Sequence, residues 1–173
     1  MYVNIFQHII RFFVLVVVQI YVLNNILFLN IINPYIYIYF ILLLPFETPN
    51  FILIILSFIL GFTVDLFTCS YAIHAFATTF IGYIRPFVLK LYSPFDGYDK
   101  NTKPTIEFYD IYWWLKYAFT ITFIHHSILF LLETFHLHNL FHTTVKALIS
   151  TILTVILITL LQYFFHKSKS KKW

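Results

Sequence analysis

Long apolar runs constrain this chain more than any other feature of its sequence. Six of them, separated by short polar stretches, fill most of the 173 residues; 61% of the residues are hydrophobic and only 10% are charged. A soluble domain exposes much of its chain to water, and roughly a quarter of its residues are charged. The composition therefore predicts an all-α integral membrane protein, with lipid as the solvent for most of its surface.

The length of each run predicts how it crosses the membrane. Five runs have the ~20 residues that a helix needs to cross a ~30 Å hydrocarbon core. The exception, "PYIYIYFILLLP", is shorter, and a short or tilted helix is expected there because an isolated strand in lipid would leave its backbone unpaired. The first run has no small-residue cleavage pattern, so we expect it to be retained. We predict one polytopic domain, 1–173, with spans at 9–29, 34–44, 49–67, 71–91, 111–133 and 144–165.

The positions of lysine and arginine predict the orientation of these spans. With six transmembrane helices and a cytoplasmic N-terminus, every lysine and arginine except Lys146 falls on the cytoplasmic side. The net charge of +4 is concentrated in the tail 166–173, "HKSKSKKW", directly after an apolar run. Such a tail favours anionic lipid headgroups as partners over nucleic acid. We therefore expect both termini in the cytoplasm, membrane lipids as partners and no nucleic acid.

The third span carries a stripe of small and polar residues. Ser57, Gly61 and Asp65 recur at every fourth position, so they share one helix face. Small residues at this spacing let another helix approach closely, whereas a carboxylate at a helix centre costs ~2.5–3.5 kcal/mol. We favour a packing seam that ends in an interfacial carboxylate over a site that performs chemistry. Thr48 is expected to cap the start of this helix, with Pro49 in its first position.

A similar stripe follows in the fourth span. Its members again share one helix face because they are spaced by four, four and three residues: His74, Thr78, Gly82 and Arg85. The short connection between the two spans makes a hydrogen bond between Asp65 and His74 feasible. We expect Arg85 to extend to the inner boundary of the membrane and to have a structural role.

The last two spans also carry polar residues. His126 and Glu133 lie two turns apart on one face, and Glu133 is expected near Lys146 across the intervening loop. An exposed ion pair of this kind contributes little to stability. The next span opens with a stripe of its own, Lys146, Ser150 and Thr154. We therefore expect these two helices to pack through polar contacts.

The loop "HLHNLFH" could supply metal ligands through His136, His138 and His142. The cysteine and carboxylate patterns of strong zinc sites do not accompany it, so a polar outer loop is the preferred interpretation. The sequence contains no nucleophile elbow, phosphate-binding loop or HExxH motif, and we predict neither an enzyme nor a cofactor.

Several stretches, taken in order, resemble the MreD family of rod shape-determining proteins, in the form found in Bacteroidota-type bacteria. They are "LVVVQIYVLNNI" (15–26), "NPYIYIYFILLLPFETP" (33–49), Gly61, Asp65 and His74 followed by "FIGYIRPF" (80–87), and "IHHSILFLLETF" (124–135). One departure is Ala72, because family members often have glycine in the turn before the histidine-led helix.

The resemblance implies a six-helix fold similar to the substrate-binding subunits of energy-coupling-factor vitamin transporters. It also implies a non-enzymatic scaffold of the bacterial inner membrane that helps maintain rod shape and peptidoglycan synthesis. Its partner would be MreC and, through MreC, MreB, RodA and the transpeptidase that works with RodA.

Two alternatives remain open at the level of sequence. In a subunit that binds a vitamin or another small ligand for transport, Asp65, His74 and His126 would line an outward-facing cavity. An intramembrane enzyme is a weaker possibility. A wide pocket walled by these residues would favour ligand binding, and dry helix contacts would favour a scaffold.

Overall fold

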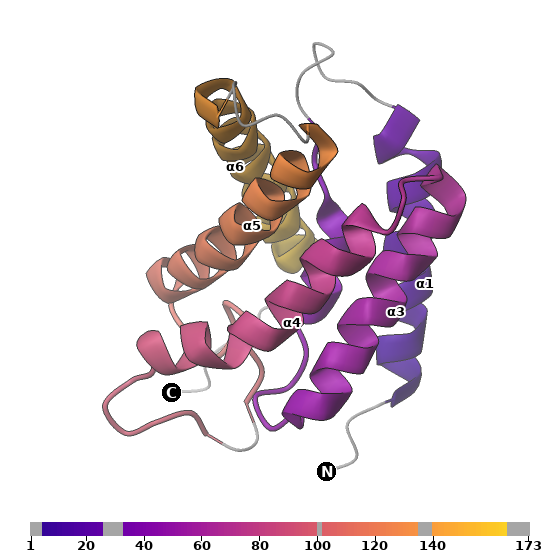
Figure 1. Cartoon of the computed structure of the whole chain (residues 1–173). Helices are drawn as coiled ribbons and strands as arrows, with labels where there is room; N and C mark the ends of the chain where they lie inside the picture. Colours follow the sequence, from indigo (N-terminus) through magenta and orange to yellow (C-terminus); the bar gives the residue numbers. More distant parts are fainter. Residues whose placement is uncertain (1–4, 26–32, 100–101, 135–139, 166–173) are drawn as a thin grey trace.

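The computed structural model describes residues 5–25, 33–99, 102–134 and 140–165 (Figure 1). Within these ranges every regular element is helical. In chain order the elements are α1 (Ile5–Tyr21), η1 (Leu23–Asn25), η2 (Ile36–Ile38), α2 (Tyr39–Leu42), α3 (Asn50–Thr68), α4 (Ile73–Leu91), α5 (Ile111–Thr134) and α6 (Leu140–Phe165).

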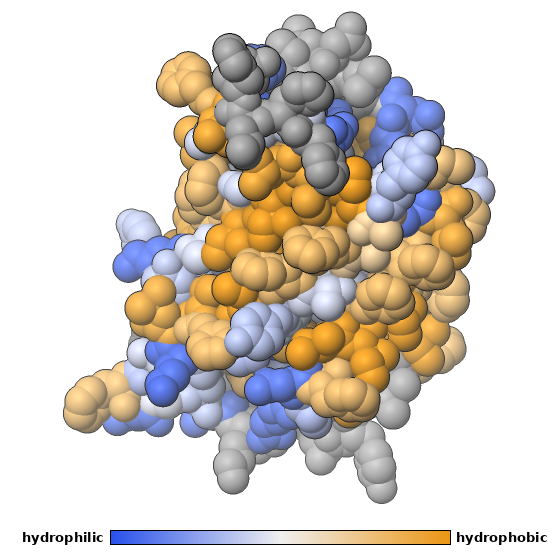
Figure 2. Space-filling model, in the orientation of Figure 1, coloured by the Kyte–Doolittle hydropathy of each residue, from blue (hydrophilic) through white to orange (hydrophobic). Residues whose placement is uncertain are grey.

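Long apolar helices make this a multi-pass membrane protein. In the described ranges, four stretches are long and apolar enough to cross a bilayer: Phe6–Asn25, Asn50–Thr68, Ile111–Thr134 and Leu140–Phe165. Large apolar side chains such as Phe13, Phe58 and Leu148 are exposed on the outer faces of these helices. Figure 2 shows a broad hydrophobic band across the middle of one face, with hydrophilic residues gathered mainly below and above it. Lipid in contact with this band accounts for the exposed aromatic and aliphatic residues.

Helix α4 has 19 residues but falls outside this set of four. Its sequence includes His74, Arg85 and Lys90, which lower its average hydropathy. It nevertheless packs closely along α3 and α5. Its polar residues are therefore covered largely by neighbouring helices.

The segment 34–44 is short and helical, as expected, but it does not form a lipid-exposed spanning helix. It contains one 3₁₀ turn and one α turn, η2 and α2, whose seven residues extend only ~12 Å. Every residue from Tyr35 to Leu44 is at most 6% exposed. Irregular backbone at membrane depth is tolerated where protein surrounds it, as it does here.

Side chains from three helices hold the first half of this buried segment. The Gln19 amide of α1 donates to the Pro34 carbonyl (3.2 Å) and accepts the Ile36 N–H (2.9 Å). The Tyr35 N–H donates to the Thr154 hydroxyl of α6 (3.2 Å), and the Tyr35 ring packs on His74 in the first turn of α4.

The second half of the segment reaches the opposite end of the bundle. Arg85 of α4 donates to the carbonyls of Leu42 and Leu44, and the Phe46 ring stacks on Tyr98 at a centroid distance of 4.2 Å. The segment thus runs alongside α4 from the first turn of that helix to Arg85.

The start of α3 differs from the sequence prediction. Thr48 does not cap the helix, because its hydroxyl donates to the Pro45 carbonyl (2.8 Å). Pro49 is the N-cap residue instead, and its carbonyl accepts the Leu53 N–H (2.9 Å). The first helical residue is therefore Asn50.

Candidate functional site

The turn between α3 and α4 has an unusual backbone. Cys69, Tyr71 and Ala72 all have positive φ values, of 55°, 50° and 64°. Non-glycine residues adopt this left-handed region at an energetic cost. Ala72 is the N-cap residue of α4 and has no side-chain group that could cap the helix. Ala72, where MreD family members often have glycine, therefore adopts a left-handed conformation that a glycine would adopt more easily.

Asp65, in the last turn of α3, supplies the missing cap of α4. Its Oδ2 accepts the Ala75 N–H (2.7 Å), and its Oδ1 accepts the His74 N–H (3.1 Å). Oδ1 also lies 3.0 Å from Nδ1 of His74, so the expected bond between these side chains is present, and it accepts the Ser70 hydroxyl (2.5 Å). The positive end of the α4 dipole further favours a carboxylate at this position. Asp65 is therefore a buried cap provided by a neighbouring helix.

The two stripes predicted from spacing meet at the α3–α4 contact. A Cβ built on Gly61 would lie 2.1 Å from the Thr78 hydroxyl, 2.4 Å from the His74 carbonyl oxygen and 2.6 Å from Cα of Ala75. A Cβ on Gly82 would lie 2.5 Å from the hydroxyl oxygen of Ser57. The glycines thus allow the close approach of the two helices.

Arg85 does not extend out of the bundle toward solvent, which corrects the expectation from sequence. It is 1% exposed, because its partners lie within the bundle. Its Nε donates to the Tyr117 hydroxyl (2.8 Å), which donates in turn to the Leu42 carbonyl (3.1 Å). Its Nη2 donates to the carbonyls of Leu44 and Leu42 at the C-terminal end of α2, where backbone oxygens carry partial negative charge. Arg85 thus has a structural role, as expected: it donates hydrogen bonds to backbone carbonyls at the end of the buried segment.

His74 and His126 both pack against the ring of Tyr35. The Tyr35 ring lies 5.5 Å from the His74 ring and 5.4 Å from the His126 ring, measured between centroids. Nδ1 of His126 donates to the Thr122 carbonyl (2.8 Å), and Nε2 lies 3.2 Å from the Thr154 hydroxyl. Both histidines of the ligand-binding alternative are therefore in contact with the same buried aromatic ring.

Glu133 and Lys146 form the ion pair that their positions predict, with 3.3 Å between Oε2 and Nζ. The Lys146 ammonium also lies 4.2 Å from the centroid of the Phe130 ring. Because both charged side chains are partly exposed, the pair is worth ~0–1 kcal/mol. It joins the ends of α5 and α6 without adding a reactive group.

The described ranges contain no metal site of the kind that the histidine-rich loop could have formed. His136 and His138 lie outside the described residues, and His142 is an exposed residue of α6. Among the residues that the structure describes, no group of three histidine, cysteine, aspartate or glutamate side chains is placed to hold a metal ion.

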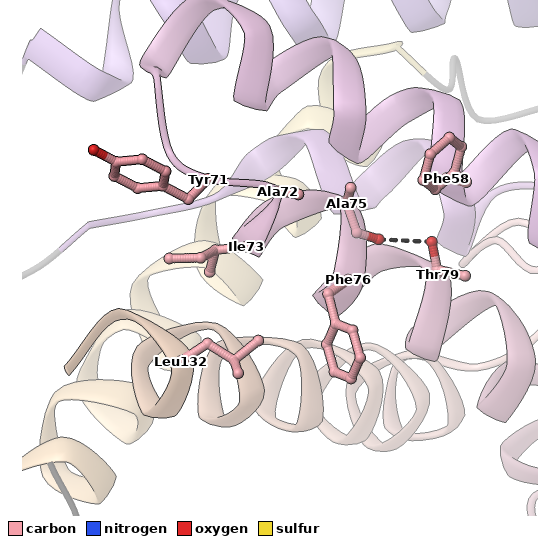
Figure 3. A pocket seen from close by; sticks show the side chains of 8 residues that line it. All are labelled: Phe58, Tyr71, Ala72, Ile73, Ala75, Phe76, Thr79 and Leu132. Atoms are coloured by element: carbon pink, nitrogen blue, oxygen red, sulfur yellow. Dashed lines mark hydrogen bonds between the residues drawn. The ribbon is translucent and has the colours of Figure 1, made fainter. Parts of the chain in front are cut away.

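An open groove of about 490 Å³ lies between the α3–α4 turn and α5 (Figure 3). Its lining is mainly apolar: Phe58, Tyr71, Ala72, Ile73, Ala75, Phe76, Thr79 and Leu132. The Thr79 hydroxyl is already used, because it donates to the Ala75 carbonyl (2.6 Å). A second groove of about 320 Å³ touches Asp65. Neither groove is lined by His74 or His126, so neither is the cavity that a ligand-binding subunit would require.

Sequence reasoning missed several residues that hold the site together. Gln19, His125 and Tyr117 are fully buried, and the Tyr37 hydroxyl lies 2.9 Å from Nε2 of His125. A lone amide inside an apolar run is costly unless it has a partner, so Gln19 could have been found from its position alone. Ser70 lies in a turn where serine is ordinary, and the sequence carries no signal of its bond to Asp65.

The fold and this site define a polytopic α-helical membrane protein whose buried polar groups bond mainly to one another. No protein-family model matches the chain, and no curated protein or solved structure is significantly similar to it. The resemblance to MreD therefore stays a prediction that depends on the sequence motifs.

Proposed function

We propose that this chain is a non-enzymatic scaffold of the bacterial inner membrane, similar to MreD in the cell-wall elongation machinery. It would bind MreC and, through MreC, act with MreB, RodA and the associated transpeptidase. The observation that supports this role most directly is the set of hydrogen bonds that Asp65 makes. All of its bonds go to the neighbouring turn and helix. A carboxylate used in this way stabilises a helix pair and is poorly placed for proton transfer.

In this proposal the chain passes through the membrane six times, with both termini in the cytoplasm. The buried segment between Pro34 and Phe46 provides the second pass, enclosed by the other helices. The distribution of lysine and arginine supports this orientation. A similarity to the substrate-binding subunits of energy-coupling-factor transporters belongs to the same proposal.

We rank the ligand-binding alternative second for two structural reasons. The Tyr35 ring packs against both His74 and His126. In transporters with broken helices, free backbone carbonyls at the break coordinate the transported ion. Here the corresponding carbonyls, at Leu42 and Leu44, already accept the Arg85 guanidinium.

Co-purification from native membranes tests the scaffold role. We expect the tagged chain to recover MreC and to restore rod shape in cells that lack it. Asp65→Asn is expected to lower both the amount of folded chain and the amount of recovered MreC several-fold, because the amide cannot accept the same set of donors. Asp96→Asn, in an exposed loop, is the matched control and should leave both amounts unchanged.

Two results would contradict different parts of the proposal. Failure of the wild-type chain to recover MreC would overturn the role in cell-wall elongation. Wild-type recovery and normal rod shape with Asp65→Asn would instead show that the α3–α4 clasp is unnecessary for assembly.

A further inference from the structure

A second polar cluster lies at the end of the bundle opposite the Asp65 turn, where α1 begins and α6 ends. We call it the basal cluster. It contains His8 and Arg11 of α1, Tyr39 of α2, Lys103 and Thr105 of the loop before α5, and Gln162 of α6. The packing of this loop and the three helices brings these residues together.

Electrostatic interactions and hydrogen bonds connect the members of the basal cluster. His8 and Arg11 are three residues apart and share a helix face. His8 lies within electrostatic range of both Arg11 and Lys103, and Tyr39 lies near Arg11 and the Gln162 amide. The Gln162 Oε1 accepts the Ile106 N–H (2.9 Å), which fixes the loop residue Thr105 beside α6.

Two buried polar atoms of the basal cluster have no hydrogen-bond partner within the described part of the chain. They are His8 Nδ1 and Thr105 Oγ1, whereas the Gln162 amide is engaged with the Tyr39 hydroxyl. Thr105 is 1% exposed, so bulk water does not reach its hydroxyl readily. Buried polar groups in native proteins nearly always have a partner, which makes two exceptions in one cluster informative.

The charge of the basal cluster indicates what the missing partner is. Among the described residues, ion pairs occur only between Asp65 and His74 and between Glu133 and Lys146. Arg11 and Lys103 are therefore two neighbouring cations without a carboxylate partner in these ranges. The Thr105 hydroxyl, on the same loop as Lys103, adds a neutral donor to a set that suits the oxygens of a phosphate group.

We propose that the basal cluster binds the phosphate group of an anionic phospholipid headgroup. A lipid is a better occupant than a soluble ion because α1 and α6 are both apolar enough to span the bilayer, which places their ends at headgroup depth. The Arg11 guanidinium can bind two phosphate oxygens, with Lys103 as a second cation and Thr105 as a neutral donor. This proposal does not depend on the cell-wall role.

Native mass spectrometry of the full chain in detergent tests this site directly. The probes are phosphatidylglycerol, phosphatidylcholine of the same chain length, and inorganic phosphate. We expect phosphatidylglycerol to be retained roughly tenfold more strongly than phosphatidylcholine, and millimolar phosphate not to displace it. If phosphate alone fills the site and displaces the lipid, the ligand is a soluble anion and the lipid assignment is wrong.

Two variants test whether lipid retention depends on the basal cluster or on positive charge in general. Arg11→Gln should weaken retention of phosphatidylglycerol roughly tenfold, because charge-assisted hydrogen bonds are the strongest in such a site. Lys116→Gln removes the same charge from an exposed position on α5 and should change retention less than roughly twofold. Equal losses in both variants would mean that binding is only non-specific attraction to positive charge.

Thr105→Val gives a test that does not depend on a folding defect. Valine is nearly isosteric with threonine, and the Thr105 hydroxyl makes no hydrogen bond in the structure, so Tm without lipid should be preserved or raised. Retention of phosphatidylglycerol should fall roughly threefold, and the rise in Tm on adding this lipid should shrink. An unchanged lipid-induced rise in Tm would overturn the proposal.

Discussion

A single side chain, Asp65, links α3 to α4. Placing a carboxylate in an apolar helix is costly, but four donors offset this cost: the Ser70 hydroxyl, the N–H groups of His74 and Ala75, and Nδ1 of His74. Two of these donors are backbone groups that a helix N-terminus leaves without partners. The same bonds therefore stabilise the charge and complete the helix.

At the same scale, Gly61 and Gly82 differ in how much room each leaves for a side chain. A Cβ on Gly61 would meet the backbone of His74 and Ala75, whereas the nearest atoms to a Cβ on Gly82 belong to the Ser57 side chain. Overpacking costs ~1–3 kcal/mol where neighbours cannot move. We expect Gly61→Ala to lower the free energy of unfolding more than Gly82→Ala, measured by unfolding in mixed detergent micelles. The opposite order would mean that the two helices separate easily at Gly61.

Residue spacing could predict only part of this site. Positions four apart predicted the faces of α3 and α4, and the short connection predicted the bond between Asp65 and His74. The bond from the Ala75 N–H to Asp65 could not be predicted, because it depends on three residues with positive φ in the turn. Backbone conformation of that kind has a sequence signal mainly where glycine or asparagine is present, and the turn has neither.

At the scale of elements, the buried segment 34–44 shows where hydropathy stops being informative. The apolar run of this segment is compatible with either a short helix or a strand. Residues buried on all sides have no polar face, so the sequence shows no periodicity that would distinguish the two. Its true surroundings depend on Gln19, Arg85 and Thr154, which come from three other helices. The two prolines that bracket the run predicted its short length, but not its enclosure by protein.

The same element gives a prediction about Arg85. Arg85→Lys and Arg85→Met should both lower the free energy of unfolding, by ~1–3 kcal/mol, because each removes the guanidinium from the buried Leu42 and Leu44 carbonyls, and only the Leu42 oxygen keeps another donor, the Tyr117 hydroxyl. Lysine is not expected to rescue stability, since one ammonium cannot reproduce the fork of the guanidinium. Lys90→Met, exposed on the same helix, should change stability by less than ~0.5 kcal/mol. Wild-type stability of Arg85→Met would show that the segment is held by packing alone.

At the scale of the whole molecule, composition predicted the class of protein, and the described helices differ in whether they are apolar enough to cross a bilayer. Four helices are apolar enough to span by themselves, while α4 and the segment 34–44 depend on their neighbours to cover polar groups or irregular backbone. A helix can carry His74 and Arg85 through a membrane protein once other helices satisfy them. Hydropathy alone therefore does not identify elements whose polar groups are covered by neighbouring helices.

The topology predicted from positive charge can be tested with the single native cysteine. Cys69 is exposed in the turn before α4, and Phe95 is fully exposed in the loop after it. The 19 residues of α4 span ~28 Å, so these positions should lie on opposite sides of the membrane. We expect a membrane-impermeant maleimide to label Cys69 in intact spheroplasts. A Cys69→Ser, Phe95→Cys variant should react only after permeabilisation. The reverse pattern would overturn the predicted orientation, and labelling of both positions from one side would show that α4 does not cross the bilayer.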